Sequence, residues 1–260
     1  MTATSTPDAT GAYDALAPFY DRFTAHHDYD LWTDGLLRLA YRHGLFGRRA
    51  LDAGCGTGKS FLPLLERGFE VTACDQSAAM LDVAATKAGR HRVTMHRRDL
   101  RALDPIGEFD LITCLDDVAN YLTVAEELTA ALAGLAGNLR RGGLLLFDAN
   151  TLATYHGFFR ETAVLEQERL LMLWRGLADE GFGPGGLASA TLDIFWQSGD
   201  GWSRTTSRHE QRHHPRETVE RCIARAGLRR VAVYGQDPAV NFDAGVDELR
   251  HSKAIYLVTR

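Results

Sequence analysis

The residues with the most chemical content form a glycine-rich loop, where residues 51–60 read LDAGCGTGKS. Gly54, Gly56 and Gly58 follow directly after a short apolar run that predicts a β-strand. Because glycine has no Cβ, the backbone can turn sharply there and a ligand can approach it closely. The pattern therefore indicates a nucleotide-like ligand.

Two well-known nucleotide motifs match this loop only in part. The dinucleotide fingerprint GxGxxG needs a third glycine where this chain has Lys59. The P-loop pattern GxxxxGK[ST] matches at residues 58–60 but has Ala53 in place of its first glycine. The apolar run before Asp148 resembles the strand that holds magnesium in P-loop enzymes, so this interpretation stays open on motif grounds.

The charge of the loop favours a ligand without phosphates. Asp52 opens the loop and Asp75 ends the next predicted strand. A triphosphate would meet these carboxylates where it needs backbone N–H groups and cations. Carboxylates accept hydrogen bonds from hydroxyl and ammonium groups instead, so the expected ligand is a nucleoside that carries both.

Further patterns accompany the glycine loop. Residues 52–58 read DxGxGxG and residues 75–84 read DxSxxMLxxA. Additional matching segments lie at residues 99–100, 109–111 and 226–228. Together they resemble the class I S-adenosylmethionine-dependent methyltransferases, and the resemblance covers about residues 13–260. It implies S-adenosylmethionine as the cofactor.

The resemblance assigns the methionine and ribose of the cofactor to residues of the first two strands. Gly54, Gly56 and Gly58 would pass beneath them. Asp52 would face the ammonium group, directly or through water, and Asp75 would accept hydrogen bonds from both ribose hydroxyls.

The same resemblance implies five residues beside the adenosine and the methionine. Asp99 would accept a hydrogen bond from the adenine amino group, and Leu100 would offer its backbone N–H to the ring. Gln76 and Met80 would pack on the adenosine, while Leu115 would lie beside the methionine.

The methyl acceptor is expected above the carboxyl ends of the strands, where open α/β sheets bind their ligands. Asp116, Asp117, Asn120 and Asn150 occupy the loops there, and Tyr20 could line the pocket because aromatic faces favour a cation. We assign Asp117, Asn150 and Tyr20 to catalysis. These loops resemble a small-molecule branch of the family that includes aminosugar and glycine N-methyltransferases and natural-product O-methyltransferases, so N- and O-methylation both stay open.

His209 is the candidate general base. It lies in a predicted strand that also carries His213 on the same face, and its HxxR spacing to Arg212 resembles the same branch. Histidine titrates near neutrality and could take a proton from an ammonium or hydroxyl group. No metal is expected, because the adjacent His213 and His214 point to opposite faces of a strand.

The elements that position these residues predict an α/β protein. Short apolar runs alternate with helical stretches up to residue 150, a pattern typical of βαβ units. We expect a Rossmann-like, mostly parallel seven-stranded sheet with helices on both faces and an antiparallel β cap inserted after strand five. The predicted parts are a disordered leader (1–11), a cofactor-binding domain with an N-terminal helical lid (12–150 and 215–260) and the cap (151–214).

Composition narrows the function further. The 260 residues carry a net charge of -5, so no positive field favours a nucleic-acid partner. The four cysteines form no CxxC pair, which fits a reducing cytoplasm, and no window is apolar enough to span a membrane. We expect a cytoplasmic, monomeric or homodimeric enzyme that methylates a small molecule. A P-loop-type nucleotide-binding enzyme and a non-catalytic S-adenosylmethionine-binding protein are the alternatives.

Overall fold

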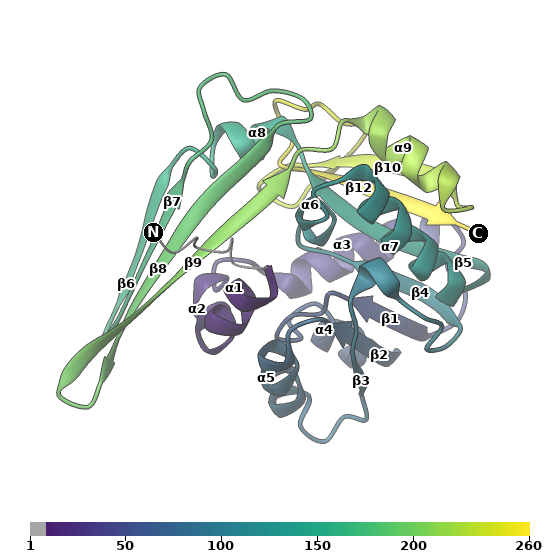
Figure 1. Cartoon of the computed structure of the whole chain (residues 1–260). Coiled ribbons are helices and arrows are strands. Elements are labelled where there is room, and N and C mark those ends of the chain that lie inside the picture. The colour runs from purple at the N-terminus through teal and green to yellow at the C-terminus, as the bar shows by residue number, and fades with distance from the viewer. Residues whose placement is uncertain (1–8) are drawn as a thin grey trace.

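The computed structural model describes residues 9–260 and contains two β-sheets (Figure 1). The larger sheet has eight strands in the order β11-β10-β12-β5-β4-β1-β2-β3. These strands are β1 (Arg49–Ala53), β2 (Glu70–Asp75), β3 (Thr94–Arg97), β4 (Phe109–Cys114), β5 (Leu139–Asn150), β10 (Arg229–Gln236), β11 (Phe242–Ala244) and β12 (Lys253–Thr259). Neighbours pair in parallel from β3 to β5 and antiparallel from β5 to β11. The predicted Rossmann-like fold is confirmed, with the three-residue strand β11 in addition to the seven expected.

Helices cover both faces of this sheet because its central strands are apolar on both sides. Ala50 and Leu111 share one core with α3 (Tyr29–Arg42), α4 (Leu62–Glu66) and α5 (Ala78–Ala88). The alternate residues Leu51 and Ile112 share the other core with α7 (Ala125–Asn138) and α9 (Arg216–Arg225). Short helical turns follow β3, β4 and β5 at η2 (Leu100–Ala102), α6 (Val118–Tyr121) and α8 (Leu152–His156). Among the helices of residues 9–260, none is long and apolar enough to cross a membrane.

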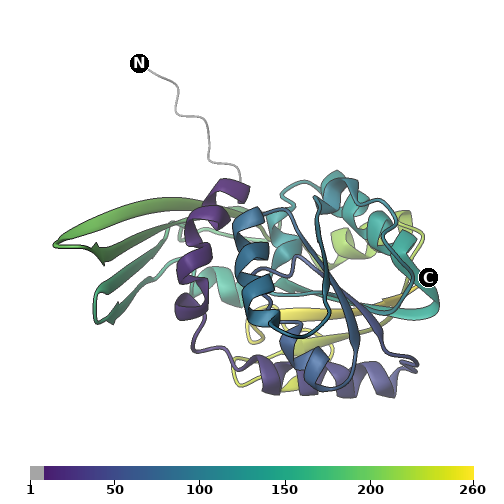
Figure 2. The same ribbon diagram turned by 90° about the horizontal axis from the view of Figure 1, so that it is seen from below.

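The smaller sheet follows β5 and is antiparallel, as the predicted cap requires. Its order is β6-β7-β8-β9, and it projects beyond the main sheet (Figure 2). The strands are β6 (Thr162–Gln167), β7 (Leu170–Gly176), β8 (Leu187–Ser198) and β9 (Gly201–Arg212). A tight turn with Arg169 at φ 66° separates β6 from β7, so the β-rich stretch at residues 161–174 forms two strands.

The N-terminal segment packs between the two sheets (Figure 1). It consists of α1 (Ala9–Leu16), η1 (Ala17–Phe19) and α2 (Tyr20–Phe23), and α1 contacts both β9 and α5. The expected disordered leader is therefore wrong for residues 9–11, which belong to α1. The helix is stabilised because Ala12 and Leu16, one turn apart, are both buried. The rest of that expectation, residues 1–8, lies outside the described residues.

Candidate active site

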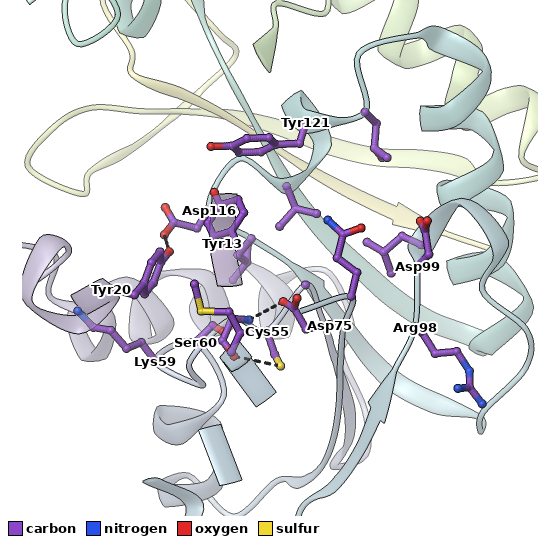
Figure 3. A pocket seen from close by; sticks show the side chains of 18 of the residues that line it. Tyr13, Tyr20, Cys55, Lys59, Ser60, Asp75, Arg98, Asp99, Asp116 and Tyr121 are labelled. Carbon is purple, nitrogen blue, oxygen red and sulfur yellow. Dashed lines mark hydrogen bonds between the residues drawn. The ribbon is translucent and has the colours of Figure 1, made fainter. Parts of the chain in front are cut away.

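A cavity lies at the carboxyl ends of β1, β2 and β4, beside the N-terminal segment (Figure 3). Most of the expected cofactor residues line it: Gly54, Gly56, Asp75, Gln76, Met80, Asp99, Leu100 and Leu115. Asp52 and Gly58 do not. The sequence patterns of the first four strands therefore converge on one site.

The glycine loop presents bare backbone to this cavity. Gly54 and Gly56 have φ values of 72° and 51°, in the left-handed region that favours glycine. A Cβ on Gly54 would stand 2.7 Å from Val118 Cγ2, so no side chain fits there. The N–H groups of Gly54 and Cys55 both donate to the carbonyl of Cys74, which fixes the loop against β2.

Asp75 is joined to the glycine loop through its carboxylate. Oδ2 accepts the N–H of Gly56 at 2.8 Å, and Oδ1 accepts the N–H of Ser77 at 2.9 Å. Burial raises the pKa of Asp75, while these backbone hydrogen bonds oppose the shift. A carboxylate oxygen has two lone pairs, so each oxygen of Asp75 can accept one further hydrogen bond from a ligand.

Asp52 and Gly58 lie behind the loop instead of facing the cavity. The Asp52 carboxylate is buried and accepts hydrogen bonds from Ser60 Oγ and from Thr113 Oγ1 at 2.7 Å. Burial raises the pKa of Asp52 to about 6. Asp52 was expected to face the cofactor's ammonium group directly or through water; in the structure Ser60, which lines the cavity, donates its hydroxyl to Asp52. Gly58 turns the chain past Phe61, whose ring would be 2.6 Å from an added Cβ.

The expected adenosine end is open to the surface. Asp99 accepts the backbone N–H of Arg101 and is paired with its guanidinium, which holds the pKa of Asp99 below its usual value. Met80 is buried beneath the cavity at the start of α5, whose first turn is capped by Ser77 Oγ. Any adenine amino group would share the Asp99 carboxylate with Arg101.

Asp116 lies at the opposite end of the cavity. It was expected in the loops near the methyl acceptor, with no role of its own. Its Oδ2 accepts hydrogen bonds from the hydroxyls of Tyr20 at 3.0 Å and Tyr29 at 2.7 Å. Burial acts to raise the pKa of Asp116, but Lys253, His27 and the two tyrosines outweigh it and hold the pKa below its usual value. Tyr20 lines the cavity as expected, and its hydroxyl points to this carboxylate (Figure 3).

Asp117 and Asn150, both assigned to catalysis, lie outside the cavity lining; Asn150 is buried and Asp117 is half-buried. Asn150 Nδ2 donates to Asp117 Oδ2 at 3.1 Å and to Gln211 Oε1 at 3.0 Å. Asn120 accepts the N–H of Asn150, so the network ties β5 to α6 and β9. Adjacent residues in this turn point apart, which sends Asp116 to the cavity and Asp117 into the interior. In this structure these two residues therefore hold the turn that carries Asp116 and do not line the cavity themselves.

His209 is not placed to act as a general base. Only 3% of its surface is exposed, and it does not line the cavity. Its Nδ1 lies 3.0 Å from the Tyr121 hydroxyl and its Nε2 lies 3.0 Å from Ser207 Oγ, so both ring nitrogens are occupied. Burial lowers the pKa of His209 to about 4. The strand alternation was predicted correctly, but helix α1 covers that face and separates His209 from the cavity.

Comparison with known proteins identifies the family of this chain. The profile described as a methyltransferase domain matches residues 50–143. A putative methyltransferase of Geobacillus sp. (strain WCH70) is 30% identical over 166 residues, which cover 62% of this chain and 67% of the relative. The chain belongs to the class I S-adenosylmethionine-dependent methyltransferases.

Two further comparisons extend the similarity over nearly the whole methyltransferase. The putative methyltransferase YqeM of Bacillus subtilis (strain 168) is 28% identical over 221 residues, covering 84% of this chain and 86% of the relative. An S-adenosylmethionine-dependent methyltransferase from Clostridium acetobutylicum ATCC 824 has the same fold, with a TM-score of 0.79 and 24% identity over 95% of this chain and 98% of that one. S-adenosylmethionine is the cofactor.

The cavity of this methyltransferase fits that cofactor. Gly54 and Gly56 leave backbone exposed where a ribose and a methionine need close approach, and Asp75 keeps one acceptor position on each oxygen for the two ribose hydroxyls. The P-loop alternative does not fit. Lys59 Nζ donates to the carbonyl and hydroxyl oxygens of Thr24 and lies 4.7 Å from the centre of the Tyr29 ring, so it braces the N-terminal segment.

Proposed function

We propose that this methyltransferase transfers the methyl group to a nitrogen or oxygen nucleophile of a small molecule, in natural-product biosynthesis. The observation that carries the proposal is one cavity that reaches from Asp75 at the glycine loop to Asp116 below the N-terminal segment. Curated relatives agree with either nucleophile. They include a glycine/sarcosine N-methyltransferase of Parasynechococcus marenigrum (strain WH8102), 34% identical over 146 residues, and a magnesium-protoporphyrin O-methyltransferase of Rhodobacter capsulatus, 37% identical over 81 residues.

In the proposed cofactor site, residues of the successive loops contact the methionine, the ribose and the adenosine of the cofactor. The backbone of Gly54 and Gly56 supports the methionine and ribose, and Asp75 accepts the ribose hydroxyls. Asp52 acts on the cofactor's ammonium group through Ser60. The remaining residues surround the adenosine or the methionine: Gln76, Met80, Asp99, Leu100 and Leu115. Residues 12–150 and 215–260 form this domain, and residues 151–214 form the cap.

We propose orientation as the main source of catalysis. When bound, the cofactor supplies a methyl group already activated by its sulfonium. His209 is buried away from the cavity and does not supply a base there, so the chain's contribution is to hold the acceptor in line with the methyl group. Such orientation is worth up to about 7–11 kcal/mol in favourable intramolecular reactions. Tyr20 and Asp116 line the acceptor end, while Asp117 and Asn150 fix the turn that presents Asp116.

Composition and the cysteines support our proposal for the cellular setting. Cys55, Cys74, Cys114 and Cys222 are all free and buried, as expected in a reducing cytoplasm. The net charge of -5 argues against a nucleic-acid substrate. We therefore propose a cytoplasmic enzyme, monomeric or homodimeric, with a small-molecule acceptor.

Two measurements test the proposed function. Isothermal titration with S-adenosylhomocysteine should show binding, whereas ATP with magnesium should show none; the reverse result would establish the nucleotide-binding alternative. A methyl-transfer screen over amines and hydroxyl compounds, read by release of S-adenosylhomocysteine, should then find an acceptor. Cofactor binding without any turnover across the screen would favour the non-catalytic alternative.

A further inference from the structure

Three carboxyl groups and the ammonium group of Lys253 lie beneath the acceptor end of the cavity. The side chain of Lys253, from β12, has its Nζ 2.6 Å from Asp148 Oδ2 and 3.6 Å from Asp116 Oδ1. Asp117 is the third carboxyl group near this ammonium. Asp148 Oδ1 is buried without a hydrogen-bond partner in the described part of the chain. Burial raises the pKa of Asp117 and of Asp148, whereas the pKa of Asp116 is held below its usual value, so Asp116 is the carboxylate of this cluster that stays ionised to the lowest pH.

The two oxygens of Asp116 differ in what they contact. Oδ2 accepts both tyrosine hydroxyls, from Tyr20 and Tyr29. For Oδ1, residues 9–260 supply no hydrogen bond; its neighbours are Lys253 at 3.6 Å and His27 Nδ1 at 4.0 Å. Because Asp116 lines the cavity, Oδ1 is free to accept a hydrogen bond from a ligand there.

Aromatic side chains line the same cavity as this free oxygen. Tyr13, Tyr20, Tyr29 and Tyr121 all line the cavity, and the Tyr13 ring centre lies 6.3 Å from that of Tyr20 and 5.3 Å from that of Tyr121 (Figure 3). The faces of aromatic rings attract cations, and a carboxylate binds an N⁺–H donor more strongly than a neutral hydroxyl. Both features select an ammonium group over an alcohol.

We propose that the acceptor is an amine that enters as its ammonium form, that Asp116 Oδ1 binds an N–H of this group, and that Lys253 is a positioning residue for Asp116. The inference rests on the proposed function and deepens it by naming the acceptor class. A primary ammonium first loses one proton to water. Its nitrogen lone pair then forms the bond to the methyl carbon, the carbon–sulfur bond breaks with its electrons left on sulfur, and a remaining N–H stays bound to Asp116.

Lys253 acts on Asp116 through charge. The groups that face Asp116 come from several elements: Tyr20 (α2), His27, Tyr29 (α3), Lys59 (glycine loop), Asp148 (β5) and Lys253 (β12), together with the neighbouring Asp117. Of these, Lys253 is the nearest ammonium to Oδ1. Its removal leaves Asp116 among like charges, so Asp116 stays protonated to a higher pH and binds an ammonium group less well.

The first test measures binding of matched probes to the protein saturated with S-adenosylhomocysteine. The probes are primary amines from methylamine to benzylamine, each compared with the alcohol of the same skeleton, by isothermal titration at pH 7.5. We expect amines to bind about 10–100-fold more tightly than their alcohols, and Asp116→Asn to remove this preference. Asp200→Asn, at the exposed tip of the β8–β9 hairpin, is the matched control and should keep it.

Several outcomes would overturn the inference. They are equal binding of amines and alcohols, a preference that survives Asp116→Asn, and no binding of any amine while S-adenosylhomocysteine still binds. Loss of S-adenosylhomocysteine binding in the unmodified protein would instead defeat the proposed function, so the two failures can be told apart.

The second test separates positioning by Lys253 from a merely structural role. Amine affinity should fall on the acidic side of the profile as Asp116 becomes protonated. In Lys253→Met, the pH at which this affinity is halved should move upward by about one pH unit, and Lys253→Arg should restore the original profile. If Lys253→Met does not fold, the same profile is measured with Asp148→Asn added, which removes both partners of the buried ion pair. An unchanged profile in the folded variant would show that Lys253 does not position Asp116.

Discussion

The two ends of the cavity are built differently. At the cofactor end, the contact between Gly56 and Asp75 joins residues 19 positions apart, within one βαβ unit. At the acceptor end, Asp116 contacts Tyr20 and Tyr29, which precede it by 96 and 87 positions. Backbone groups dominate the first end and side chains the second. The cofactor end therefore depends on local chain geometry, whereas the acceptor end depends on how distant elements pack.

The largest effect that tests this difference is expected at Asp75. Asp75→Ala should weaken binding of S-adenosylhomocysteine by about 1.5–3 kcal/mol, the range for hydrogen bonds to a charged group. Titration calorimetry measures the affinity, and thermal unfolding without ligand is the control. A collapse of thermal stability with unchanged affinity would show that Asp75 only caps the glycine loop.

The second effect concerns buried charge at the acceptor end. Burial, together with Asp116 and Asp148, raises the pKa of Asp117 to about 7 despite the opposing Lys253. A carboxyl group with a higher pKa in the folded state holds its proton more tightly there, so wild-type stability falls as pH rises from about 4 to about 7. Asp117→Asn, which keeps an oxygen acceptor, should therefore gain stability relative to wild type across this range, by about 1–3 kcal/mol.

Denaturant unfolding at pH 4, 5.5 and 7.5 measures the stability difference between wild type and Asp117→Asn. Asp200→Asn, with an exposed carboxylate, should show no such trend. A difference that stays constant with pH would mean that Asp117 is not protonated preferentially in the folded protein.

A smaller effect on turnover is expected at His209. His209→Ala removes buried contacts with Tyr121 and Ser207, so the melting temperature should fall. Turnover per folded molecule should change by less than about 10-fold, because a general base would contribute about 10²–10⁴-fold. A loss in that larger range, partly restored at high pH, would return His209 to the catalytic role first predicted.

The smallest effect is expected at the tip of the cap. Trp202 lies at the start of β9, beside the β8–β9 turn, is 61% exposed and does not line the cavity. The cap that carries it projects beyond the main sheet (Figure 2). Trp202→Ser should leave both cofactor affinity and turnover within about 2-fold of wild type, since exposed substitutions rarely change stability by more than about 0.5 kcal/mol. A large loss of turnover would show that the tip, and not only the base of the cap, contributes to the acceptor site.

The sequence predicted the cofactor end well because its signals are local. Alternating glycines after a strand and an acidic residue after the next are visible as patterns, and the structure brings Gly54, Gly56 and Asp75 to one cavity. The position of Asp52 behind the cavity lining was not predicted, because it depends on one hydroxyl group, that of Ser60, which donates to the Asp52 carboxylate. Spacing along the chain does not reveal such shielding.

The acceptor end could be located but not resolved from sequence. Asp116 and Asp117 are adjacent and chemically identical, and only the backbone of the turn, with φ values of 65° and 59°, decides which carboxylate faces the cavity. Likewise, strand alternation placed His209 and His213 on one face of a strand, but packing of α1 against β9 decided that this face is closed. Both outcomes depend on tertiary contacts that no local pattern encodes.

The position of β12 has a consequence for the order in which the protein folds. β12 lies between β5 and β10, which do not pair with each other, and it is the last strand along the chain to join the sheet. Strands β1 to β4 can pair through short crossovers before it arrives, whereas contacts of large sequence separation form slowly. Because β12 brings Lys253, the acceptor end is complete only when the last strand along the chain has joined the sheet.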